Sequence, residues 1–161
     1  MDDWQERIDA VWHAAGERDE QETVAAINAL VAERDPGDPI ALFEAAGARD
    51  FAGREAEAEP LYRAALDAGL AEPQRGQAII QLASTLRNLD RPEEALGMLR
   101  DLLQEDPGHE LAGAAHAFAA LALFDSGLPA SALREALDAL AQRLPRYGRA
   151  VAAYAAELED S

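Results

Sequence analysis

Apolar residues recur along the chain at spacings of three and four, in short segments separated by strong turn signals. Asp35-Pro-Gly-Asp-Pro39 and Asp106-Pro107-Gly108 are the clearest breaks, because proline and glycine together do not continue a helix. This spacing is typical of amphipathic helices. It predicts nine helices, near residues 3–16, 20–34, 39–51, 55–68, 74–89, 92–105, 110–126, 130–143 and 146–159.

The turn residues repeat with a period of 37. Gly53, Asp90 and Gly127 are each followed five residues later by an alanine. A single helical hairpin cannot bury its apolar side, so successive hairpins stack into a solenoid. The pattern predicts an all-α, right-handed solenoid of helical hairpins in a single domain. It comprises a degenerate N-terminal hairpin (1–36), three repeats of period 37 (39–145) and a C-terminal capping helix (146–161).

The last segment carries four apolar residues at helical spacing. Tyr147, Val151, Tyr154 and Leu158 follow one another at intervals of four, three and four. Such residues share one face of a helix. We therefore expect this face to cover the third repeat, as the terminal caps of solenoids do.

The composition favours helices over strands. The chain has 38 Ala and 21 Leu, but only 4 Val, 5 Ile and 2 Thr. Alanine and leucine are strong helix formers, whereas strands are rich in β-branched residues. The absence of cysteine excludes disulfides, thiolate zinc sites and cysteine nucleophiles.

The charge balance excludes several kinds of partner. Fourteen arginines, no lysine and 31 acidic residues give a net charge of −17. Such a chain repels nucleic-acid phosphates and anionic lipids, and Arg143, Arg146 and Arg149 are too few to reverse this. The longest apolar run, 111–124, is too short to span a bilayer. The acidic start, 1–4, lacks the features of a secretory signal, so we expect a cytoplasmic protein whose partner is basic.

The repeat has the features of a known family. The alternation of small and large residues, the Gly or Asp at each inner turn and the closing Asp106-Pro107 resemble tetratricopeptide repeats over residues 39–145, with a period longer than the usual one of about 34. The run 80–96 is similar to a family of small bacterial tetratricopeptide proteins, in which one extra helix follows the last repeat. The resemblance implies protein binding and no catalytic residues. His116 and Ala136 depart from the bulky apolar and aromatic residues of the pattern.

The first helix of each hairpin lines the concave face of such a solenoid, and it supplies the candidate binding residues. Arginine offers a two-pronged donor, and asparagine and glutamine pair with peptide groups. These properties predict a groove for a peptide or protein segment. A second hypothesis is internal pairing, in which Arg87 bonds Asp50 and stacks on Phe124. The candidates are Gln77, Gln81, Ser84, Arg87 and Asn88, with Asp50 and Phe124 in the neighbouring repeats.

The sequence is also compatible with two other roles. One is a structural protein that forms homo-oligomers through its Trp4–Trp12 face or its cap. Another is a small-molecule binder or enzyme that uses the Gln81–Arg87 region. No nucleophile–base pair or phosphate-binding motif is visible, so we expect no catalytic residue and no cofactor. His13 and Glu17 are two possible ligands, which is too few for a metal site. We expect His116 to be buried or at the groove edge.

Overall fold

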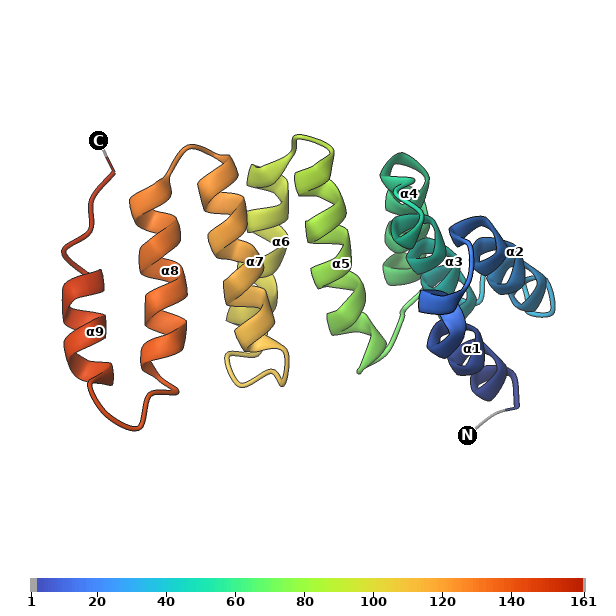
Figure 1. Cartoon of the computed structure of the whole chain (residues 1–161), viewed down its shortest axis with the longest axis horizontal. Coiled ribbons are helices and arrows are strands. Elements are labelled where there is room, and N and C mark those ends of the chain that lie inside the picture. The colour runs from blue at the N-terminus through green and yellow to red at the C-terminus, as the bar shows by residue number, and fades with distance from the viewer. Residues whose placement is uncertain (1–2, 161) are drawn as a thin grey trace. The chain divides into compact units, whose positions relative to one another are not determined.

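Nine α-helices form the described part of the chain, which contains no strand. The structure is a computed structural model that describes residues 3–160. The helices follow one another as Figure 1 shows: α1 (Asp3–Ala14), α2 (Glu20–Val31), α3 (Pro39–Phe51), α4 (Glu55–Asp67), α5 (Gln74–Asn88), α6 (Pro92–Glu105), α7 (Ala112–Asp125), α8 (Pro129–Ala141) and α9 (Gly148–Ala155), with a 3₁₀ turn, η1 (Ala15–Glu17), after α1. The all-α prediction is confirmed.

The chain divides into two compact units, one up to residue 85 and the other from residue 86, and the division falls within α5. In the first unit α1, α2 and α3 enclose an apolar core. The indole of Trp4 also donates a 2.8 Å hydrogen bond to the carbonyl of Leu30, which ties α1 to the end of α2. The buried core residues are Trp4, Ile8, Val24, Ile27, Ala41 and Ala48.

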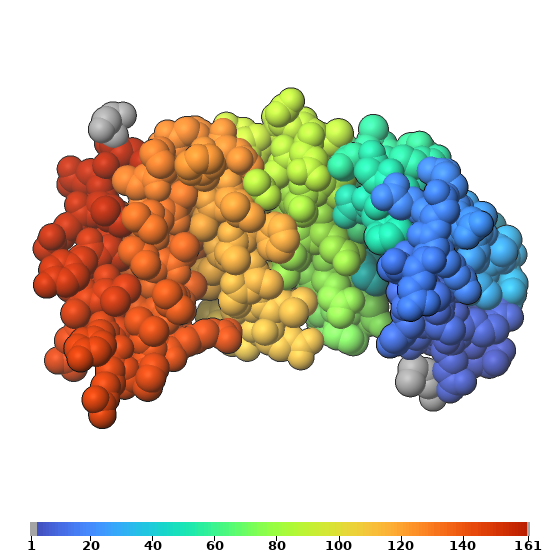
Figure 2. Space-filling model, in the orientation of Figure 1, coloured from blue at the N-terminus to red at the C-terminus, as the bar shows by residue number. Residues whose placement is uncertain are grey.

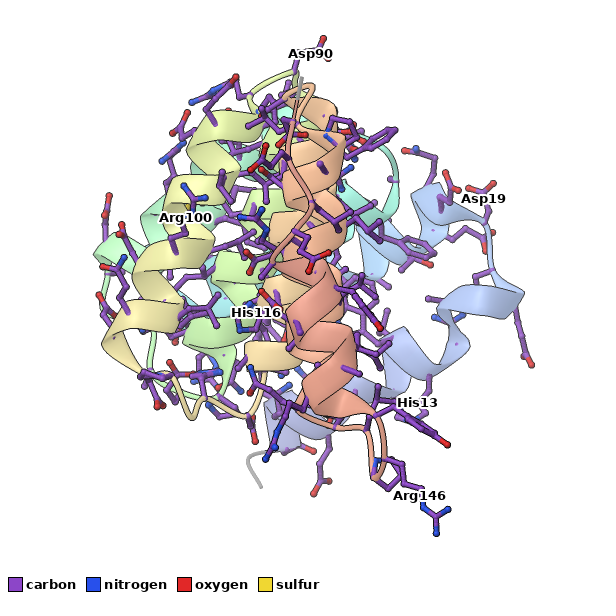
Figure 3. The ribbon with its side chains drawn as sticks, turned by 90° about the vertical axis from the view of Figure 1, so that its left-hand side faces the viewer. His13, Asp19, Asp90, Arg100, His116 and Arg146 are labelled. Carbon is purple, nitrogen blue, oxygen red and sulfur yellow. The ribbon has the colours of Figure 1, made fainter. Side chains whose placement is uncertain are left out.

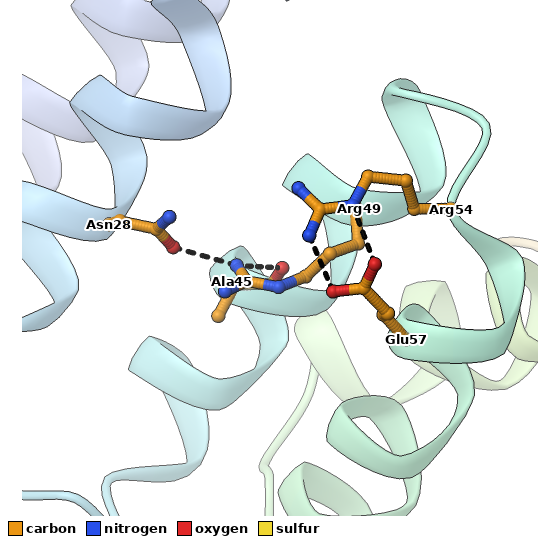
Figure 4. A network of polar contacts seen from close by, with 5 residues as sticks. All are labelled: Asn28, Ala45, Arg49, Arg54 and Glu57. Atoms are coloured by element: carbon orange, nitrogen blue, oxygen red, sulfur yellow. Dashed lines mark hydrogen bonds and ion pairs between the residues drawn. The ribbon is translucent and has the colours of Figure 1, made fainter. Parts of the chain in front are cut away.

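Two arginines of the first unit, Arg49 and Arg54, make polar contacts that Figure 4 shows. Arg49 of α3 donates to the side-chain oxygen of Asn28 in α2 at 2.7 Å and to the carbonyl of Ala45 at 2.9 Å. Arg54 precedes α4 and bonds both carboxylate oxygens of Glu57, at 2.7 and 2.5 Å. An acidic residue in the first turn is favoured by the helix dipole. The Arg49 contacts thus tie α3 to α2, and the Arg54–Glu57 pair closes the first turn of α4.

The second unit is a sequential array in which α7 packs against α6, α8 against α7 and α9 against α8 (Figure 1). Leucines from α6 and alanines from α7 meet in its core. Small residues let two helices approach closely, and the leucines fill the remaining space. Fully buried members are Leu99, Ala115, Ala119 and Ala122.

Three inner turns, 37 residues apart, share a left-handed backbone conformation. Gly53, Asp90 and Gly127 have φ angles of +65°, +58° and +77°. Glycine adopts this region without steric cost, and aspartate is among the few other residues that visit it. The repeated glycine or aspartate of the sequence therefore reflects one backbone requirement at each hairpin turn.

We predict opposite effects for the same substitution at two glycines. Gly127→Ala should lower the free energy of unfolding by about 1 kcal/mol, because a Cβ is strained at positive φ. Gly97 lies inside α6, and a Cβ there meets no atom within 4 Å. Gly97→Ala should therefore raise the free energy of unfolding by about 0.5–1 kcal/mol. Urea titrations of both variants test this; destabilisation by both would contradict it.

The C-terminal helix differs from its prediction. The sequence indicated a helix near 146–159, but α9 covers only Gly148–Ala155. Tyr147 takes a left-handed conformation with φ +67°, so the helix begins after it. Tyr147 and Tyr154 are exposed, whereas Ala155 is fully buried. Val151 and Leu158 are half-buried, so the predicted face is wrong only for the two tyrosines. Tyr147 lies before the helix, and the buried side of α9 is centred on Ala155 rather than on Tyr154.

The segment after α9 is held against α8 by polar contacts. The Asp160 carboxylate accepts hydrogen bonds from the backbone amides of Ala130 and Ser131, at 2.7 and 3.0 Å, at the start of α8. Arg134 donates to the carbonyls of Ala155 and Leu158. The amides at a helix N-terminus lack partners within the helix, so a carboxylate stabilises them. Asp160 thus caps the N-terminus of α8, although it lies in the segment after α9.

Candidate functional site

Four of the predicted residues lie in a row on α5. Gln77, Gln81, Ser84 and Asn88 follow one another at intervals of four, three and four, which places them on one helix face. The glutamines and Asn88 are exposed, and Ser84 is half-buried. We call these four residues the α5 row. It presents amide and hydroxyl groups along about three turns of helix.

Asp50 stands at the centre of a hydrogen-bonded cluster in the first unit. Tyr62, from α4, directs its hydroxyl at Asp50 Oδ2 (3.3 Å) and at Gln81 Oε1 (3.1 Å). Thr85 directs its hydroxyl at Asp50 Oδ1 (3.2 Å). We call Asp50, Tyr62, Gln81 and Thr85 the Asp50 cluster. Through it, α3 and α4 orient one amide of the α5 row.

The electrostatics of the cluster follow from burial. Desolvation raises the pKa of Asp50, and hydrogen bonds from Thr85 and Tyr62 offset part of this rise. Burial likewise raises the pKa of Tyr62, followed by the nearby negative charge of Asp50. The donors on the carboxylate are neutral hydroxyls, so its charge is not compensated by a direct ion pair. A cationic group is the ligand that this carboxylate favours.

Sequence reasoning missed Tyr62 and Thr85. Thr85 lies one helical turn after Gln81, and this spacing was the available signal. Tyr62 lies on another helix and is fully buried, packed against Phe43 with ring centroids 6.2 Å apart. Periodicity marks it only as a core residue. Its role depends on the packing of α4 beside α3.

Arg87 has a different partner from the one predicted. Its Nε donates to Asp125 Oδ2 at 2.7 Å, and both residues belong to the second unit. Asp50, in the first unit, accepts instead from the hydroxyls of Tyr62 and Thr85. Internal pairing of Arg87 is thus correct in kind, but Asp50 is wrong as its partner. The guanidinium of Arg87 instead meets the carboxylate of Asp125, the residue after Phe124. Phe124 itself is 64% exposed.

A shallow polar hollow surrounds this ion pair. Its walls come from the end of α5, the following turn, the start of α6 and the end of α7. The hollow is lined by Arg87, Asn88, Asp90, Pro92, Glu93 and Asp125. Because acidic residues outnumber the arginine, the hollow is suited to a cationic or amide-bearing group rather than to an anion.

A buried carboxylate in the first unit was not predicted. Glu44 of α3 accepts a 2.7 Å hydrogen bond from the indole of Trp12, which is on α1. The carboxylate is buried, and desolvation raises its pKa, while the Trp12 hydrogen bond lowers it in part. Trp12 also meets Phe51 edge to face, with centroids 6.0 Å apart. The Trp12 ring is therefore held in place by both α3 contacts.

We predict that Glu44→Gln stabilises the protein in a pH-dependent way. A carboxyl group whose pKa is raised by folding binds its proton more tightly in the folded state, so its cost is present when it is ionised and vanishes below its unfolded pKa. The variant should melt at a higher temperature than wild type at about pH 8, with the difference closing towards about pH 4. Asp101→Asn, at an exposed aspartate inside α6, removes one negative charge as a control. A difference independent of pH would contradict the assignment.

His13 and His116 each make a contact with a nearby residue, and the two contacts are far apart in the sequence. His13 bonds the carbonyl of Asp9 at 2.7 Å, and α1 ends at Ala14, so Glu17 does not continue the same helix face. His116, labelled in Figure 3, lies half-buried beside Glu135, with 2.6 Å between Nδ1 and Oε1. Among residues 3–160, no group of three or more His, Cys, Asp or Glu side chains is placed to hold a metal ion.

No helix in the described part of the chain has the length and apolar character needed to cross a membrane. This finding agrees with the short apolar run seen in the sequence.

A comparison with protein families identifies the family of the chain. The family described as "Tetratrico peptide repeat" matches residues 39–158, which is most of the sequence. The chain belongs to the tetratricopeptide repeat family, whose members generally mediate protein–protein interaction and are typically non-enzymatic. Neither the curated proteins nor the solved structures give a match to it. The narrower likeness to small bacterial members stays a prediction.

Proposed function

We propose that this chain is a protein-interaction module, and that the Asp50 cluster and the α5 row bind an extended segment of a partner protein. The observation that carries the proposal is the arrangement around Gln81. The Tyr62 hydroxyl approaches the side-chain oxygen of Gln81, so the NH₂ group of this amide is left to face a ligand. Amide donors spaced along a helix suit the carbonyls of a peptide backbone.

The charge of the site indicates the chemistry of the partner. Asp50 is half-buried beside neutral donors, and the whole chain carries a net charge of −17. A segment with an arginine or lysine would supply the countercharge at Asp50 and would be drawn in over longer distance by the net charge. We therefore infer a basic segment, whose association rate falls as salt rises. We also infer binding without catalysis, a role supported by the family.

The test is affinity capture from the native lysate with matched variants. Gln81→Arg places a positive charge beside Asp50 and should remove the captured partner. Gln104→Arg makes the same change at an exposed glutamine of α6 and should leave capture unchanged. Both proteins should melt near the wild-type temperature. Equal capture by the two variants would contradict the proposed site.

A further inference from the structure

The apolar side of α8 is buried less than its counterpart one repeat earlier. Leu96 of α6 is 8% exposed, whereas Leu133, 37 residues later, is 49% exposed. Leu99 is fully buried, whereas its counterpart Ala136 is exposed. The difference follows from the next helix, since α7 packs along α6, while α9 is short and is held by the start of α8 and by Arg134.

A hollow marks the uncovered surface. It lies between α7 and α8, at the end away from their connecting turn, as the space-filling view shows (Figure 2). Leu140 is 50% exposed at its edge. Leu121 and Leu133 extend the apolar surface at helical spacing from Ala117 and Ala136. The hollow is lined by Gly113, Ala117, Ala136, Ala139, Leu140 and Arg143.

One end of the hollow is basic. The Arg143 guanidinium reaches across to Gly113, 2.9 Å from where a Cβ of that glycine would stand. Residues 139–156 contain three arginines and no acidic residue, although the net charge is −17. Arg146, one of the three, projects away from the helices in Figure 3. An uncovered apolar surface with a cationic rim favours an apolar ligand that carries negative charge at one end.

We propose that the surface formed by Ala117, Leu121, Leu133, Ala136, Leu140 and Arg143 docks an amphipathic helix of a partner protein, with acidic residues in the first turn of that helix. A helix fits because α7 covers the corresponding side of α6 one repeat earlier, whereas the shorter α9 packs against α8 and leaves Leu133, Ala136 and Leu140 exposed. Since α7 follows α6 through a short loop and runs antiparallel to it, a docked helix would place its N-terminus beside Arg143. This surface is separate from the Asp50 cluster, and its occupation does not depend on the proposed function.

The chain itself supplies a probe. A synthetic peptide with the sequence of residues 109–126 and the substitution Ala112→Glu contains α7 and carries Glu110 and the added glutamate at its N-terminal end. We expect the full-length protein to bind a fluorescent form of this peptide. Leu140→Asp should weaken binding by at least about tenfold, because it places a charge at the centre of the apolar contact. Tyr154→Asp, at an exposed apolar residue of α9 outside the hollow, should have little effect.

A charge swap tests the orientation. Arg143→Glu should weaken binding about threefold at low salt and less at high salt. A peptide with Glu110→Arg should regain that loss on the Arg143→Glu protein. Arg100→Glu, at an exposed arginine of α6, controls for the change in net charge.

Three results would overturn the proposal. They are an absence of peptide binding, binding that Leu140→Asp leaves intact, and a wild-type dimer in sedimentation velocity that Leu140→Asp dissociates. The last would assign the surface to a second copy of the chain. Circular dichroism of each variant establishes that it is folded.

Discussion

Tyr62→Ala is expected to lower the free energy of unfolding by about 3–5 kcal/mol, the usual cost of removing a fully buried aromatic side chain. Tyr62 is 0% exposed, packs against Phe43 and directs its hydroxyl at Asp50 and Gln81. The variant therefore creates a cavity and removes a donor from a half-buried carboxylate. Domains are stable by only about 5–15 kcal/mol, so much of the protein should unfold near physiological temperature. Urea denaturation followed by circular dichroism measures the effect.

Two further variants separate the contributions. Tyr62→Phe removes only the hydroxyl and should cost about 0.5–1.5 kcal/mol. Tyr154→Ala removes an exposed ring of α9 and should change stability by less than about 0.5 kcal/mol. If Tyr62→Ala were as mild as Tyr154→Ala, the packing between α3 and α4 described above would be incorrect.

Removal of residues 146–161 is the second change with a large expected effect. It takes away the acceptor for the first amides of α8, the carbonyls bonded by Arg134 and the burial of Ala155. We expect Tm to fall by roughly 5 °C or more, since about 2–4 °C corresponds to each kcal/mol in a domain of this size. Newly exposed alanines and leucines of α8 should also promote aggregation.

A point variant distinguishes capping from burial. Asp160→Asn keeps the shape of the side chain but weakens its bonds to the amides of Ala130 and Ser131, so it should lower Tm by less than the truncation does. Differential scanning calorimetry compares the three proteins. A truncated protein that melts as wild type does and stays monomeric would show that α9 contributes nothing to the second unit.

Helix boundaries were predictable where local chemistry sets them. The predicted segments 39–51 and 92–105 match α3 and α6, because a proline opens each helix at its first position. In α3 the Asp38 carboxylate also accepts hydrogen bonds from the amides of residues 40 and 41. The last helix was not predictable in this way. Its start depends on the left-handed Tyr147, and its end depends on Arg134, a residue of another helix.

The candidate site was predictable only in part. Helical spacing along α5 was enough to place Gln77, Gln81, Ser84 and Asn88 on one face. The period of 37 suggested a partner for Arg87 but selected Asp50 rather than Asp125, because a repeat gives equivalent positions and not side-chain directions. Contacts made between helices, such as Tyr62 to Gln81 and Trp12 to Glu44, require the packing of those helices to be known.

The most direct test of binding at the α5 row is site-specific photo-crosslinking in the native cell. A photoreactive residue in place of Gln77 lies on the α5 row without disturbing the Asp50 cluster, and one in place of Gln104 lies at an exposed site of α6. The account predicts that illumination joins the chain to a discrete partner from position 77 and not from position 104. A crosslink from position 104 alone, or the same products from both positions, would contradict it.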